Sequence, residues 1–461
     1  MVSAVWRSGC MLALCGLMSG CATLRTSQAH YEGTDAALRT GNPKTALVHV
    51  RAYTPAKKDR LLHLLDVGLL EHWSGAYEAS TRTLTEAEEL FDKLRAQSLS
   101  ELPRRLLIND NAADYTGDEI EEIYLHLFKA LNFLALEQTD AAWVEVRTLD
   151  AKLIRLQRDY ESAYEQWPHH LEELPRSEHP FHESALARWL GMLLYRHEGR
   201  WDDVRIDQQR LQLAFSQQQH LYPFAPPDLS EFNRPIQHTQ ARLSLIAFHG
   251  LRPRKEARSL TVHTDENVVM LSKSYRDAEG QRGLTGWETI FWPGVDPGLH
   301  LSLALPRLQE RPSQVGFVEV MINGKRKMRL EPLESMQTLT RAAFEEQLPL
   351  LYLRTLTRAI GKAVVFEEAE EELTEEMNAG WAALTRIGLG ALLDQTEQAD
   401  LRTARFFPAE ASIGELILPV GRHTIEFSYY TPTGRLIHRD PPRTIELRPH
   451  TLHLEQAAYL D

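Results

Sequence analysis

The sequence predicts an α+β multidomain protein in which a helical domain precedes a mainly antiparallel, sandwich-like β domain with a helical insertion. Apolar residues recur at steps of three and four over residues 31–219, which is typical of packed helices. A Pro-rich stretch without periodicity follows at 220–237 and predicts a linker. Alternating apolar residues then predict strands over 238–461, interrupted by a helical interval at about 334–396. The 461 residues are enough for two or three domains.

The first 20 residues have the pattern of a signal peptide. A single Arg7 precedes an apolar run from Cys10 to Met18, about half the ~20 residues that a membrane-spanning helix needs. The run leads into Leu17-Met18-Ser19-Gly20-Cys21, which resembles the lipobox of bacterial lipoproteins. That resemblance implies that a diacylglycerol is attached to the Cys21 sulfur and that the chain is cut before this residue.

All three cysteines lie within the first 21 residues, so the rest of the chain has no thiol for a disulfide, a metal site or catalysis. We therefore expect Cys21 to be a membrane anchor, with residues 21–30 as a lipidated linker. Ala22 follows it, and by resemblance to enterobacterial sorting rules a residue other than Asp there implies the outer membrane. The alternative is a plain secretory signal in which Cys21 is incidental.

Four helix breaks divide residues 31–219 in a similar way. Aligning them on Gly41, Gly75, Glu137 and Gly199 gives spacings of 34, 62 and 62 residues. The first equals the tetratricopeptide (TPR) period and the others are near two periods, so we expect a TPR-like helical repeat domain. The alternative is an irregular helical bundle. The position five residues after each turn should be small, so that the second helix can approach the first. Ala46 and Ala142 fit this pattern, and Ser80 and Val204 replace the small residue in the other two turns.

A polar loop interrupts the repeats between residues 106 and 123. Asn109, Asp110 and Asn111 are turn formers, and Asp118 is placed to cap a helix with acidic residues in its first turn. The loop is a candidate binding edge, and it is equally well explained as a connection.

The C-terminal half has strand and turn signals. Asn323-Gly324 lies between two alternating segments and predicts a hairpin. Further turns are expected at Val420-Gly421 and Thr433-Gly434, between strands of an antiparallel sandwich.

Several segments between about residues 55 and 430 together resemble a poorly characterised family of Gram-negative lipoproteins. The most specific pieces are Asn109-Asp110 with Tyr115, Gly117 and Glu121, and Ala399-Asp400-Leu401-Arg402 ahead of Pro408 and Pro419. The chain departs from that pattern at Ala404 and Phe406-Phe407. The resemblance implies a TPR-like domain followed by a β-containing domain and no established enzymatic activity. Members are sometimes encoded beside lipoproteins proposed to activate cell-wall synthases or to help assemble surface secretion systems.

Histidine spacing offers little metal chemistry. His169-His170, His179, His182 and Glu183 fall in one polar segment, which could bind a transition metal weakly but is better explained as a solvated connection. No HExxH, GxSxG, SxxK or P-loop pattern occurs, so we predict no cofactor, no metal and no enzymatic activity.

Arg354, Arg358 and Lys362 recur every four residues and would form one basic face of a helix. Such a face can grip a phosphate or a partner's carboxylates. Pairing within the chain, with the acidic run 367–376 or with Asp400, is the favoured interpretation.

The acidic balance, 51 Lys+Arg against 64 Asp+Glu, disfavours nucleic-acid binding. We expect a lipid-anchored periplasmic scaffold or adaptor that binds envelope proteins, because TPR-type repeats use their inner helices to bind peptides. The alternative is a polysaccharide- or peptidoglycan-binding protein or enzyme acting through the C-terminal domain. The sequence sets no oligomeric state. The candidate partner-binding residues are Asn109, Asp110, Tyr115, Arg354, Arg358, Lys362, Asp400 and Arg402.

The aromatic residues near the helical turns are a further candidate set. Packing between repeats is their commoner role, and some of them could line a groove. They are Trp73, Tyr77, Trp143 and Trp201.

Overall fold

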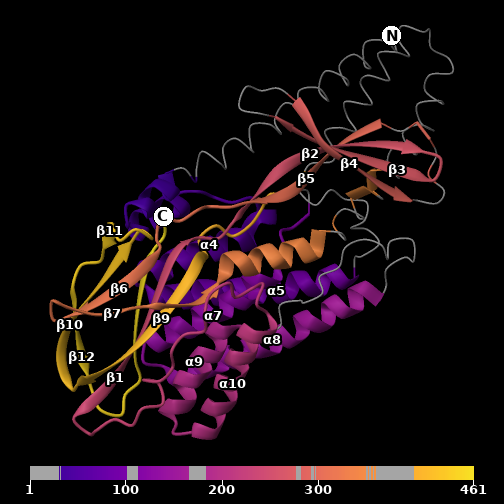
Figure 1. Ribbon diagram of the computed structural model, residues 1–461. Helices are drawn as coiled ribbons and strands as arrows, with labels where there is room; N and C mark the ends of the chain where they lie inside the picture. Colours follow the sequence, from indigo (N-terminus) through magenta and orange to yellow (C-terminus); the bar gives the residue numbers. More distant parts are fainter. Residues whose placement is uncertain are drawn as a thin grey trace, which may run out of the picture.

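The predicted α+β class is confirmed, with helices in the N-terminal half and several antiparallel sheets in the C-terminal part (Figure 1). The computed structural model describes residues 31, 33–100, 113–165, 183–276, 282–291, 295, 297–298, 300–348, 351, 355–356, 358–359 and 399–461. The predicted signal peptide, Cys21 and the linker 21–30 lie outside these residues. No helix in the described ranges is long and apolar enough to cross a membrane.

The helices follow one another in antiparallel pairs. A helical segment at 33–39 precedes α3 (Pro43–Arg51) and the short η1 (Lys57–Asp59). Three longer hairpins follow: α4 (Arg60–Trp73) with α5 (Tyr77–Ser100), α7 (Glu119–Ala135) with α8 (Thr139–Glu165), and α9 (Ala185–His197) with α10 (Trp201–Gln217).

The four predicted turns share one geometry. Gly41, Gly75, Glu137 and Gly199 have φ values of 71°, 76°, 57° and 75°, the left-handed conformation that ends a helix. At Gly75 the N–H donates to the carbonyl of His72, and the next N–H donates to that of Glu71, both at 2.9 Å. The equivalent pair of bonds closes the other three turns. The recurring helix breaks in the sequence therefore correspond to one repeated turn.

The residue five positions after each turn is fully buried, as expected for a site where the second helix approaches the first. The four residues are Ala46, Ser80, Ala142 and Val204. Ser80 satisfies its hydroxyl by donating to the carbonyl of Gly68 at 2.7 Å. The predicted capping of α7 is also confirmed: Asp118 accepts from the Glu121 N–H, and the Glu121 side chain accepts from the Asp118 N–H.

Three sheets make up the C-terminal part. The first, here called the central sheet, has the order β13-β1-β9-β8, and the second has the order β11-β10-β6-β7 with β12 paired to β10. The third has the order β4-β3-β2-β5 and lies apart at the upper right of Figure 1. The strands are β1 (Gln240–Leu251), β2 (Arg254–Asp265), β3 (Val268–Arg276), β4 (Arg282–Phe291), β5 (His300–Gln309), β6 (Phe317–Ile322), β7 (Lys325–Arg329), β8 (Glu331–Ser335), β9 (Pro408–Pro419), β10 (Gly421–Tyr430), β11 (Leu436–Arg439), β12 (Arg443–Leu447) and β13 (His453–Tyr459).

Strand pairing is antiparallel except between β1 and β13, which are parallel. The predicted hairpin at Asn323-Gly324 joins β6 to β7, and both residues have positive φ, as a tight two-residue turn requires. The predicted turns near Gly421 and Gly434 also join consecutive strands.

The central sheet is buried on both faces. Leu243 and Leu245 of β1 point into a core shared with the second sheet. Ile246 and Phe248 of the same strand point into the core formed by the helices. A strand covered on both sides reads as a nearly continuous apolar run, and β1 does so.

The predicted linker and the predicted helical interval both contain ordered structure. Leu221, Tyr222 and Phe232 of the predicted linker 220–237 belong to the core of the helices. Within the predicted helical interval 334–396, β8 continues to Ser335 and residues 336–348 are helical.

Candidate binding site at the helix–sheet junction

The inner face of the helical array is covered by the protein's own sheet. Trp73 of α4 and Phe128 of α7 pack edge-to-face at 5.1 Å between ring centroids, and both contact Phe248 of β1. Trp73 also donates its indole N–H to the carbonyl of Phe406. The apolar side chains of α4 and α7 are thus buried against the chain's own strands. Partner binding by the helices stays a prediction.

Segment 399–407, just before β9, reaches into the helical half through Arg402. The Arg402 guanidinium donates to Asp400 at 2.7 Å, to Asp59 at 3.0 Å and to the carbonyl of Ala113 at 3.0 Å. Burial alone would lower the pKa of Arg402, but Asp400 and Asp59 raise it above its ordinary value. The predicted residues Asp400 and Arg402 thus pair with each other and tie two parts of the chain together.

Tyr115 lies beside the same segment and is buried. Its hydroxyl donates to Glu121 at 2.6 Å, and Glu121 also accepts from the backbone N–H of Ala404 at 2.7 Å. Arg252 completes the cluster by donating to Asp118 at 2.7 Å. Tyr115 was predicted to contact a partner. Because it is only 4% exposed, its described contacts are internal instead.

The pKa values of the two carboxyl groups in this cluster are shifted in opposite directions. Burial and the neighbouring Asp118 raise the pKa of Glu121. Burial would also raise the pKa of Asp118, but the adjacent Arg252 holds it below its ordinary value. The two motif pieces singled out in the sequence, around Tyr115 and around Arg402, therefore meet in space as an internal junction.

The remaining predicted site residues are divided between the core and the undescribed part of the chain. Arg358 is buried at 4% exposure. The others, Asn109, Asp110, Arg354, Lys362 and the histidines of the 169–182 segment, lie outside the described residues.

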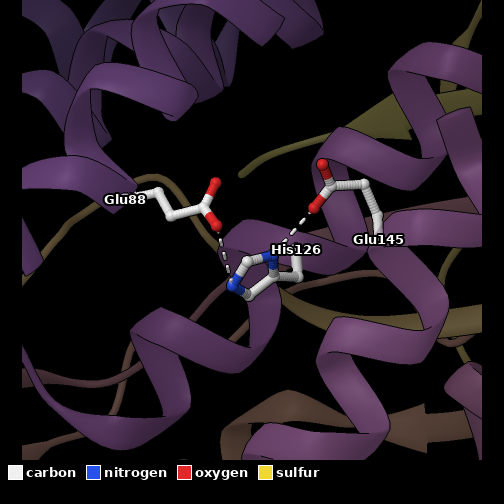
Figure 2. A group of neighbouring side chains, drawn as sticks. All are labelled: Glu88, His126 and Glu145. Atoms are coloured by element: carbon white, nitrogen blue, oxygen red, sulfur yellow. Dashed lines mark hydrogen bonds and ion pairs between the residues drawn. The ribbon is translucent and has the colours of Figure 1, made fainter. Parts of the chain in front are cut away.

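A histidine and two glutamates meet between α5, α7 and α8, as Figure 2 shows. His126 is fully buried; its Nδ1 lies 2.8 Å from Glu145 and its Nε2 lies 3.9 Å from Glu88. Lys129 bonds both carboxylates, Glu88 at 2.5 Å and Glu145 at 2.8 Å. Although burial opposes it, the two carboxylates raise the pKa of Lys129. The ammonium already supplies the positive charge that a metal would bring, so we interpret the group as a structural ion pair.

A cavity of about 510 Å³ opens where the last helical hairpin meets the central sheet. Three stretches of the chain line it: the α9–α10 turn, residues 233–244, and the loop between β12 and β13. Its size falls in the range of pockets that bind small molecules or peptide ends, roughly 300–1,000 Å³.

The lining of this junction pocket is basic. Arginines and histidines contribute from all three stretches, and none of the described lining residues is acidic. The basic residues are Arg196, Arg242, Arg448, His197, His238, His450 and His453.

Large apolar side chains stand at the same opening. Trp201, the first residue of α10, is 47% exposed, and Ile236 is 39% exposed. Leu452 and two prolines extend the apolar wall. Of the aromatic residues noted at the helical turns, Trp73 packs internally and Trp201 lines the pocket.

This pocket was not predicted from the sequence, because its lining comes from stretches separated by up to about 250 residues and follows no local motif. A scan against protein-family models, a search of curated proteins and a search of solved structures each found no match for the chain. The function is therefore argued from the geometry and chemistry of the junction pocket.

Proposed function

We propose that this protein is a lipid-anchored adaptor of the cell envelope, facing the periplasm, which binds another protein without chemical turnover. The observation that carries the proposal is the junction pocket, where exposed Trp201 and Ile236 stand beside basic side chains at an open cavity. Exposed aromatic and arginine side chains around a cavity are enriched at protein interfaces.

The architecture of the helical half also supports the proposal, because its last hairpin forms one wall of the pocket. Its repeated turns and the buried residue five positions after each favour a TPR-like array. The central sheet covers the inner face of these helices. We therefore place the partner-binding site at the end of the array, where α9 and α10 meet β1.

The anchor is proposed from the lipobox-like sequence that ends in Cys21 and from the absence of cysteine after it. Several acyl chains, each contributing about 0.8 kcal/mol per buried methylene, would hold the N-terminus stably in a bilayer. The body would then be held close to membrane-bound or periplasmic partners.

The test compares proteins that co-purify from crosslinked native membranes. A Trp201→Ala/Ile236→Ser double variant removes the apolar wall of the pocket. The matched control, Val144→Ala/Ile154→Ala, removes side chains on α8 that are 61% and 58% exposed. We expect at least one envelope protein to fall about tenfold with the pocket variant and to be retained with the control. Equal recovery of every protein with the pocket variant would contradict the proposal.

A further inference from the structure

The floor of the junction pocket carries a positive charge that no ion pair among the described residues neutralises. Arg196 and Arg242 both bind the single carboxylate of Glu415, with N···O distances of 2.8 and 2.9 Å. The three side chains are about one-tenth exposed. Two guanidinium groups against one carboxylate leave one charge in excess, and a charge held away from water is costly unless an opposite charge meets it.

Only some of the N–H groups of Arg242 are used in hydrogen bonds to described residues. Its Nη1 donates to Glu415 and to the backbone carbonyl of Glu231, at 2.9 and 2.5 Å. Its Nε and Nη2 make no hydrogen bond to any residue in the described part of the chain. A guanidinium with two such N–H groups is shaped to bind a carboxylate through a pair of parallel bonds.

The residues at the rim of the pocket also favour binding of an anion. His197, His238 and His450 are exposed and make no hydrogen bond or ion pair among the described residues. Arg448 stands at the same rim, where it pairs with Glu137. The rim therefore adds imidazole N–H groups as hydrogen-bond donors above the charged floor.

The walls define the rest of the ligand. Trp201, Ile236 and Leu452 offer apolar surface, and the uncharged polar side chains of the lining are amides and hydroxyls. No carboxylate among the described lining residues would repel an anion. A ligand with one carboxylate attached to an apolar group fits both the floor and the walls.

We propose that the junction pocket binds the C-terminal carboxylate of a partner polypeptide whose last side chain is apolar. The carboxylate is held by Arg242 above Glu415, and the apolar side chain packs between Trp201 and Ile236. This inference rests on the adaptor function, for which it names the part of the partner that is recognised. Capture of a chain terminus is a known mode of peptide recognition.

The test uses the full-length protein in detergent and a library of heptapeptides fixed through their N-termini, made once with free and once with amidated C-termini. We expect binding of free-acid peptides that end in an apolar residue and at least tenfold weaker binding of their amides. Arg242→Gln should abolish this difference, whereas Arg205→Gln, on the exposed face of α10 at 72% exposure, should preserve it. Trp201→Ala should weaken binding without abolishing the preference for the free acid.

Three outcomes would overturn the inference: no peptide binds, amides bind as tightly as acids, or decanoate or an oligogalacturonate binds while peptides do not. Thermal unfolding of Arg242→Gln near the wild-type temperature shows that the loss is local. If Arg242→Gln fails to fold, the comparison of acid with amide on the wild-type protein decides alone. A pocket-dependent envelope partner in the co-purification experiment, together with equal binding of acids and amides, would reject this inference and keep the adaptor function.

Discussion

The indole N–H of Trp73 donates to the backbone carbonyl of Phe406 at 3.0 Å, although the two residues are 333 positions apart. The bond fixes segment 399–407 against α4, just before β9 enters the central sheet. Phe406 and Phe407 are both fully buried in the core of the helices. Helices and central sheet therefore share one hydrophobic core.

Phe406→Ala should consequently destabilise the helices and the sheet together. Removing a buried phenylalanine costs about 3–5 kcal/mol. Urea unfolding followed by far-ultraviolet circular dichroism and by tryptophan fluorescence should shift to lower urea with both probes coinciding. Leu436→Ala, at 43% exposure, is the control and should change little. A helical transition that stays at the wild-type urea concentration would show that the two parts unfold independently.

Gly117 should tolerate a side chain poorly for two separable reasons. Its φ of 71° disfavours residues with a Cβ, and a Cβ would lie 2.1 Å from the ring of Phe91. Gly75 has a φ of 76° but open space around it, so it isolates the backbone effect. We expect Gly75→Ala to cost about 1 kcal/mol and Gly117→Ala about 2–4 kcal/mol. Equal urea midpoints for the two variants would contradict the packing argument.

Asp66 makes the free energy of unfolding depend on pH. Burial raises the pKa of Asp66 to about 7, against an ordinary value of 3.8. Between these values the folded protein keeps a proton that the unfolded chain releases, so stability falls as the pH rises from about 4 to about 7. The full effect is on the order of 4 kcal/mol.

Asp66→Asn should make stability depend less on pH, because an amide does not titrate. Its oxygen can accept from the N–H of Arg405, and its NH2 can donate to the hydroxyl oxygen of Tyr31. Urea unfolding at pH 5 and pH 7.5 measures the difference. Some slope should persist, since burial also raises the pKa of Glu410 to about 7. An unchanged slope in the variant would mean that Asp66 is ionised in the folded protein.

Glu415 should be needed for stability as well as for shaping the pocket. Glu415→Gln leaves Arg196 and Arg242 without their counter-charge while both are about nine-tenths buried. Breaking such a pair from one side costs about 3–5 kcal/mol. Asp202→Asn, which removes an exposed partner of Arg205, should cost less than about 0.5 kcal/mol. Similar unfolding temperatures for the two variants would contradict the burial argument.

Cys21→Ala should release the protein from membranes and leave its body folded, because the proposed anchor precedes in sequence the helices and sheets that the structure describes. Fractionation should place the wild-type chain with membranes and the variant in the soluble fraction. The circular dichroism spectra of the two should coincide. Retention of the variant in the membrane fraction would reject the anchor.

Sequence patterns predicted those features that depend on neighbouring residues. The helical turns at Gly41, Gly75, Glu137 and Gly199, the cap at Asp118 and the hairpin at Asn323-Gly324 all follow from local backbone and side-chain preferences. Contacts between distant segments could not be predicted in this way. The parallel pairing of β13 with β1 joins residues more than 200 positions apart, and it has no local signature.

The candidate site shows the same division. Trp201 was noted as an aromatic residue at a helical turn, but nothing in the sequence indicated that it would face Ile236 and Leu452. Conversely, Tyr115 and Arg402 belong to the two segments that are most specific for the family resemblance. Their internal contacts depend on how segment 399–407 packs against α7 and the residues just before it. A polar residue can serve the core or the surface, and tertiary packing decides between them.

Site-specific photocrosslinking in native cells tests the central claim most directly. A benzoylphenylalanine at position 236 places the reactive group at the pocket, and the same group at position 154 places it on the exposed face of α8. The account predicts a discrete adduct with another envelope protein from position 236 that is lost when Arg242→Gln is added, and none of that adduct from position 154. The same adduct from both positions, or no adduct from position 236, would contradict it.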